Sequence, residues 1–278
     1  MTTLEGIKGL NGREPVGAAL TIGVKDKARG FPTETDRFHL VAPREENGRR
    51  APMPAFSGFN SAAPEARKVI RGNLVHASRS DCFECHLKNQ VGPRGAHPNR
   101  RPFCIGDGVR AVRWLGGDAD NFADIDCPNK RCEFRIAPDG KPVPCKPWLR
   151  LLFRLRWKDG SPLPQLLVKF ASGSWNTAAN AVGFFEYIDD TAKHLGLTDY
   201  SLFGLPFTMT LIRQTKASSK SAFPVVGFSP EIDPVSWFMQ QRAQLRELGA
   251  PTPIAALSDE RDIDVVASDH VVISVPST

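Results

Sequence analysis

All six cysteines of the chain fall between positions 82 and 145. The last four stand in segments rich in Gly and Pro, namely CIGDG (104–108), CPNKRC (127–132) and CKP (145–147). Structural zinc sites take four thiolates, and Gly- and Pro-rich turns let the backbone curl around the ion. We therefore predict one tetrahedral Zn²⁺ site on Cys104, Cys127, Cys132 and Cys145, which would tie three segments together. Free buried thiols are the alternative, and disulfides are disfavoured in a chain without an export signal.

A second pair of cysteines precedes a histidine in the segment CFECH (82–86). This spacing has the form of a c-type haem attachment site, but covalent haem requires export to an oxidising compartment. A second metal held by Cys82, Cys85 and either His86 or His97 is one interpretation. Surface thiols, or alternative ligands for the first metal, are equally consistent with the pattern.

The chain has 278 residues, of which 41% are hydrophobic, so it can bury a substantial core. We predict a flexible N-terminal arm (1–14), a single domain (15–249) with a zinc module inserted at 82–148, and a disordered tail (250–278). The first residues lack the apolar run of a signal peptide, and no apolar run reaches the 18 residues of a membrane span. We therefore expect a cytoplasmic protein.

Charge is segregated along the chain, whose formal net charge is +6. Residues 94–158 carry 14 Lys and Arg against 7 Asp and Glu, whereas residues 230–278 carry 3 against 8. A basic surface beside a zinc site fits nucleic-acid phosphates, which supply most non-specific affinity. A solvated basic face is the alternative. The predicted nucleic-acid contacts are Arg110, Arg113, Lys130, Arg131, Lys146, Arg150, Arg154 and Arg156.

Hydrophobic periodicity predicts an α+β fold with mainly antiparallel strands and two principal helices. Helical spacing of apolar residues indicates one helix over 176–195 and another over 234–248. Alternation favours strands at 19–24, 38–41, 73–77, 109–114, 148–157, 165–171, 205–213 and 222–228, the last two paired. Residues 29–37 are expected to form a turn, 63–70 a short helix and 118–126 an acidic loop.

Sequence motifs of common enzymes are absent. The chain has no Walker loop, no dinucleotide-binding glycine pattern and no nucleophile elbow. None of its histidines is followed two residues later by Glu, as a zinc deaminase requires. Asp107, in the segment GDG, is best explained as a turn residue. These observations favour a protein without a catalytic site.

Several short motifs occur in an order that resembles a known family. They are IGVK (22–25), GFPTETDRF (30–38), CIGDG (104–108), the pair Cys127 and Cys132, CKP (145–147), LRLLF (149–153), SGSWNT (172–177) and GLPFTMTL (204–211). Their order and spacing are similar to those of recombination directionality factors of temperate phages and mobile elements, which act with large serine integrases. Cys82, Cys85 and the acidic tail fall outside that pattern.

The resemblance implies a non-enzymatic accessory protein in a bacterial host cell. Such a protein binds a large serine integrase, and with it DNA, and redirects the integrase from integration to excision. In that reading the four cysteines hold zinc. Two alternatives come from other classes of protein: a metal-dependent nucleic-acid enzyme such as a nuclease, and a single-stranded DNA-binding protein that uses the Trp and Arg residues of 148–157 for stacking.

Overall fold

The computed structural model of the chain describes residues 16–25, 32–43, 57–92, 95–99, 102–127, 132, 135–136, 138–156, 162–215 and 222–247. The predicted arm (1–14), the predicted tail (250–278), Lys130 and Arg131 lie outside these ranges. None of the helices within the described ranges is long and apolar enough to cross a membrane.

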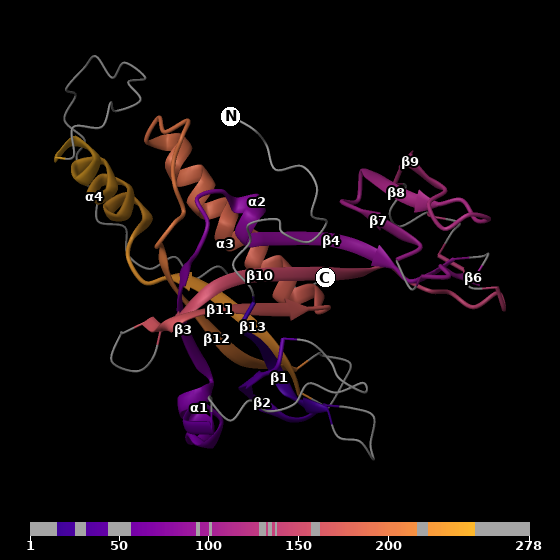
Figure 1. The fold of residues 1–278 in the computed structure, drawn as a ribbon, viewed down its shortest axis with the longest axis horizontal. Helices are drawn as coiled ribbons and strands as arrows, with labels where there is room; N and C mark the ends of the chain where they lie inside the picture. Colours follow the sequence, from indigo (N-terminus) through magenta and orange to yellow (C-terminus); the bar gives the residue numbers. More distant parts are fainter. Residues whose placement is uncertain are drawn as a thin grey trace, which may run out of the picture.

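The described chain is an α+β fold in which nearly all strand pairs are antiparallel, as predicted (Figure 1). Its helical elements are α1 (Ser57–Ser61), the 3-10 helix η2 (Pro64–Arg67), α2 (Arg79–Cys82), α3 (Trp175–His194) and α4 (Pro234–Glu247). Its strands are β1 (Ala18–Lys25), β2 (Pro32–Val41), β3 (Val69–Leu74), β4 (Phe83–Asn89), β5 (Val91–Gly92), β6 (Gly95–Ala96), β7 (Cys104–Gly106), β8 (Arg110–Trp114), β9 (Phe122–Asp126), β10 (Lys146–Arg156), β11 (Pro162–Ser172), β12 (Pro206–Thr215) and β13 (Ala222–Pro230).

Strand β10 is the centre of the main sheet. It pairs with β11 along one side, and on its other side with β4 near its start and β3 near its end. Beyond β3 the sheet continues through β12 to β13, and beyond β4 it continues through β7 and β8 to β9. Strand β1 joins β11 in the only parallel pair among the described strands, and β2 completes that edge.

The sequence of β10 explains its central place. Leu149, Leu151, Phe153 and Leu155 recur at every second position and are at most 1% exposed, so one face of the strand lies wholly in the core. Arginines occupy three positions of the other face. Because side chains alternate between the faces of a strand, this pattern predicts a half-buried strand, and the structure confirms it.

Helix α3 covers the apolar face of the sheet. Its buried residues include Ala181, Phe184, Phe185 and Ile188, which recur at helical spacing and belong to the main core. The Ser174 hydroxyl accepts a hydrogen bond from the backbone N–H of Thr177, which caps the first turn. The burial of this stripe against the sheet therefore fixes the position of the first turns of α3 beside β4 (Figure 1).

Most of the predicted elements are confirmed within a few residues. The two principal helices, the strand at 109–114 and the paired strands at 205–213 and 222–228 all occur. Four predictions are wrong in part. Strand β2 begins at Pro32 inside the expected turn, η2 ends at Arg67, β3 spans Val69–Leu74 rather than 73–77, and β9 occupies half of the expected acidic loop.

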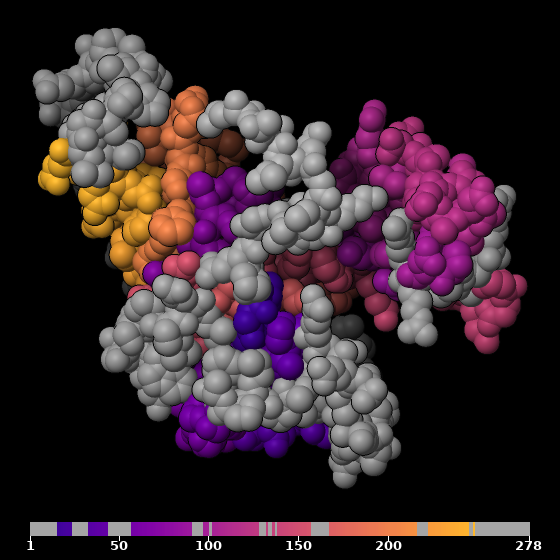
Figure 2. Space-filling view, in the orientation of Figure 1, coloured from indigo at the N-terminus to yellow at the C-terminus, as the bar shows by residue number. Residues whose placement is uncertain are grey.

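The described residues from 91 to 145 form a projection that we call the cysteine lobe. In Figure 1 it lies to the right, at the far end of β4 and β10 from helix α4, and in Figure 2 it stands out as a lobe of its own. It contains β5 to β9 and has a small aromatic cluster in which Phe103 and Trp114 are 2% and 7% exposed. Cys82 and Cys85, which the predicted module (82–148) includes, pack with the main core and not with this lobe.

Candidate functional site

Four of the six cysteines meet at the base of the cysteine lobe. They line one small cavity of about 10 Å³ together with Leu87, Asn89, Phe103 and Arg113; the cysteines are Cys104, Cys127, Cys132 and Cys145. This is the set that the sequence analysis assigned to zinc. All six cysteines of the chain are free thiols.

The strands of the lobe bring three separate segments to this cavity. Cys104 is the first residue of β7, where it pairs with Asn89 of β4. Cys127 directly follows β9, and its backbone N–H donates to the carbonyl of Val109 over 2.7 Å. Cys145 directly precedes β10. The convergence of these thiols therefore follows from strand pairing.

Burial around the cavity favours protonated thiols, and the cationic side chain of Arg113 lies beside them. Burial, and then the neighbouring thiols, raise the pKa of Cys104 and Cys145, whereas Arg113 acts in the opposite direction on Cys104. The Arg113 side chain is largely buried, and its Nη2 lies 3.8 Å from Cys132 Sγ. A guanidinium at this position would stabilise thiolates once they lose their protons.

Four thiols around a cavity of ionic size fit the ligand set that Zn²⁺ prefers. Nevertheless, no group of three or more His, Cys, Asp or Glu side chains within the described ranges has an arrangement that already could hold a metal ion. The thiols therefore share a cavity without standing in ligating positions. Binding an ion there requires the thiols to move into ligating positions.

The residues considered for a second metal are not gathered at one point. Cys82 ends α2 inside the core, donates its S–H to the carbonyl of Ser78 over 3.0 Å, and has its pKa raised by burial to about 11. Cys85 and His86 are neighbours on β4, so their side chains leave opposite faces of the strand. Neither arrangement favours a shared metal.

His97 has a structural role inside the cysteine lobe. Its ring is 2% exposed and lies against Trp114 and Phe122, with centroid distances of 5.0 and 5.5 Å. Its Nδ1 accepts from the backbone N–H of Asn99 over 3.1 Å, so Nε2 carries the proton that it donates to the carbonyl of Ala119 over 2.7 Å. Because both ring nitrogens are engaged, this histidine is not disposed to ligate a metal.

Several of the predicted nucleic-acid contacts form ion pairs within the fold. Arg150 pairs with Glu84 on the adjacent strand β4, and Arg156 pairs with Glu231. Arg154 is half-buried, and the ring of Trp148, predicted as a stacking surface, is covered by Lys88 at 3.2 Å from its centroid. These residues of β10 and its neighbours therefore stabilise the sheet.

Two predicted contacts do present cations to solvent. Arg110 at the start of β8 and Lys146 at the start of β10 are exposed. Both belong to the cysteine lobe or to its junction with the main sheet. Within the described residues, the exposed part of the predicted nucleic-acid surface thus consists of these two cations.

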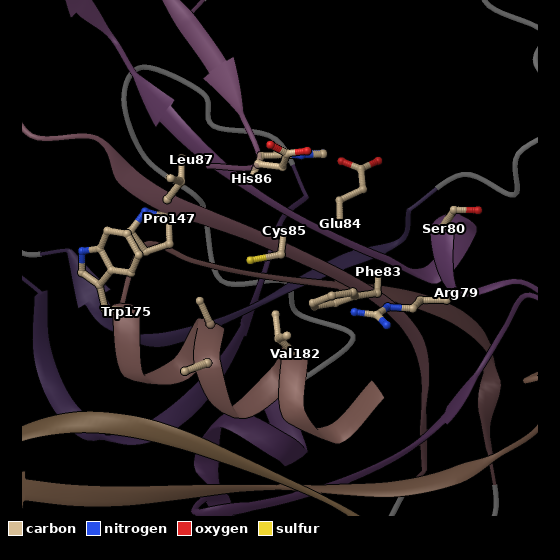
Figure 3. A pocket seen from close by; sticks show the side chains of 13 residues that line it. Arg79, Ser80, Phe83, Glu84, Cys85, His86, Leu87, Pro147, Trp175 and Val182 are labelled. Atoms are coloured by element: carbon tan, nitrogen blue, oxygen red, sulfur yellow. The ribbon is translucent and has the colours of Figure 1, made fainter. Parts of the chain in front are cut away.

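A larger feature, which the sequence analysis missed, is a groove of about 1010 Å³ between β4 and the first turns of α3 (Figure 3). Cys85 faces α3 across this groove, and Trp175 stands at one end of it. No sequence motif predicts this groove, because it forms where β7 separates from β4. The one sequence signal is the tryptophan at the first position of α3, Trp175, which the structure leaves 56% exposed.

Comparison with known proteins then identifies the family. The model of the family described as "Gp3-like: Recombination directionality factor-like" matches residues 19–231. The chain belongs to this family. The match begins in β1 and ends just beyond β13, so it includes the main sheet, α3, the groove and the four-cysteine cavity. No curated protein and no solved structure matched the chain.

Proposed function

We propose that this protein is a non-enzymatic recombination accessory protein that binds a large serine integrase and favours excision over integration. The observation that carries the proposal is the family match across residues 19–231. In this proposal the integrase supplies the serine nucleophile and breaks the DNA strands. The protein described here contributes a binding surface on a rigid sheet.

The same proposal assigns one structural Zn²⁺ to the four-cysteine cavity. Cys104, Cys127, Cys132 and Cys145 would hold the ion, and Arg113 beside Cys132 would offset the negative charge of the thiolates. A bound zinc would cross-link three segments of the cysteine lobe, whose own apolar cluster is small. The metal is thus assigned to folding of the lobe.

DNA contact is the third part of the proposal and rests on exposed positive charge. Arg110 and Lys146 are the predicted cations that remain exposed within the described residues. Long basic side chains on a lobe that projects from the sheet can reach phosphates beside a bound integrase (Figure 2). Because phosphate contacts release counterions, binding through them should weaken as salt rises.

The deciding experiment is a recombination assay with the purified protein and the large serine integrase encoded in the same mobile element. We expect the protein to enable recombination between the two hybrid attachment sites and to inhibit the integration reaction. Binding to the integrase should be measured in parallel by titration. If neither direction of recombination changes and the two proteins do not bind, the proposed function is wrong.

A further inference from the structure

The groove between β4 and α3 covers part of the face of the sheet, where Pro147 of β10 lines it, and extends to the edge of β4. It is lined by five successive residues of β4, from Phe83 to Leu87. Successive side chains of a strand point to opposite faces, so a pocket over one face would touch every second residue. Contact with all five places the groove beside the backbone itself.

The backbone along this groove has no strand beside it among the described residues. On one side, β4 pairs with β10 from Phe83 to Lys88. On the other side, β7 pairs with β4 only from Leu87 to Asn89. The outer edge from Phe83 to His86 is therefore open for hydrogen bonding to another strand.

A tight turn explains why β7 leaves β4 so early. The carboxylate of Asp107 accepts hydrogen bonds from the backbone N–H groups of Val109 and Arg110, both over 2.7 Å. Gly108 follows with φ of 103°, a conformation that favours glycine. The chain thereby reverses into β8 opposite β4, and beyond Gly106 none of the described strands continues the line of β7 along β4.

The two walls of the groove differ in character. The wall from α3 is apolar and has small side chains, Ala178 and Ala179, between Trp175 and Val182. Glu84 and His86 leave β4 away from this wall (Figure 3). At one end lies the exposed carboxylate of Asp107, whose pKa is lowered by the backbone N–H groups it accepts from, and for which the described residues offer no ion pair.

We propose that an extended segment of the partner recombinase binds here as an added strand beside β4; this inference rests on the proposed function. Exposed strand edges are sites at which proteins recognise extended peptides, with backbone hydrogen bonds for affinity and side-chain pockets for specificity. The walls specify the segment. It has apolar side chains at alternate positions, which face α3, and a Lys or Arg at the end near Asp107. Trp175 is the aromatic anchor of the contact.

The test uses two groove variants of the full chain, each with a matched control on α3. Trp175→Ala removes the anchor, and its control is Tyr187→Ala, because both aromatic side chains are exposed, at 56% and 52%, and only Trp175 lines the groove. Ala179→Arg fills the groove from an exposed helix position. Its control is Gly183→Arg, since Gly183 is also exposed and sterically free but does not line the groove. Thermal unfolding verifies that all four remain folded.

Affinity for the purified integrase is the first measurement. We expect each groove variant to bind about tenfold more weakly or worse, as for loss of an interface anchor, and each control within about twofold of the wild type. The second measurement is backbone amide exchange, in which those amides of residues 84–86 that point away from β10 should become protected in the complex. The inference is wrong if the wild type binds the integrase and both groove variants bind it with the same affinity. It is also wrong if the wild type binds without protection of these amides. Either result would leave the proposed function intact.

Discussion

Replacing Cys145 by serine tests the zinc site most directly. Cys145 lines the cavity together with the other three thiols, so an ion bound there would have four equivalent ligands. Structural zinc contributes roughly 10–16 kcal/mol to folding of small zinc domains, so one ligand in four accounts for roughly 2.5–4 kcal/mol. At roughly 2–4 °C per kcal/mol for a domain of this size class, Cys145→Ser should lower the Tm by about 5 °C or more.

The same substitution should matter little once zinc is removed. Burial raises the pKa of Cys145, so without a metal the group is a neutral thiol, and a serine hydroxyl replaces it at a cost of roughly 1 kcal/mol. The matched control is Cys85→Ser, because Cys85 is also half-buried but lies in the groove and not in the cavity. It should keep its zinc and lose little stability with or without chelator.

The assay combines elemental analysis with thermal unfolding of the wild type and both variants, each before and after chelator treatment. The expected results are about one zinc per wild-type chain and a chelator-dependent stability difference for Cys145→Ser alone. A wild-type protein purified without chelator and free of metal would refute the assignment. So would an equal loss of Tm by Cys145→Ser in chelated and untreated protein.

Two further predictions concern charged and titratable side chains. Arg110→Ala should weaken DNA binding and reduce its salt dependence without changing the Tm, whereas Arg150→Ala should lower the Tm because it leaves Glu84 unpaired; equal effects on the Tm would contradict the assignment. Burial and then Arg67 lower the pKa of His39 below its ordinary 6.5, because the folded protein favours the neutral imidazole. The stability that depends on neutral His39 is therefore complete above pH 6.5 and is lost as the pH falls. Urea unfolding across pH should show a shallower acid-side slope for His39→Gln, and an unchanged slope would exclude His39 as the cause.

The sequence predicted those helices and strands that bury one face, because burial of one face imposes a regular spacing of apolar residues. Helix α3 has a regular apolar stripe and a serine cap, and β10 carries buried residues at every second position from Leu149 to Leu155, so both were located within a few residues. The four cysteines of the cavity were also predicted, because metal ligands have a residue type and spacing that do not depend on the rest of the fold. Whether they hold zinc stays a prediction.

The features that the sequence did not predict share one physical cause: they depend on contacts between segments that are far apart in the chain. Strand β4 reads FECHLKN, and its middle residues are all half-buried, so the segment lacks the alternation of a half-buried strand and resembled a ligand motif. Strand β9 reads FADID and alternates acids outward in a way that looks like a loop. The open edge of β4 depends on where β7 turns away, and no local pattern records that.

The four-cysteine cavity and the groove are connected through one strand. Leu87 lines both, and it pairs with Gly106 at the last point where β7 follows β4. Two residues earlier on β7, Cys104 faces Asn89 at the cavity. A zinc bound to Cys104 would therefore fix the point at which β7 departs, and with it the length of β4 edge left open. On this argument the proposed metal would do more than stabilise the lobe, because it would set the shape of the surface that we propose for the partner recombinase.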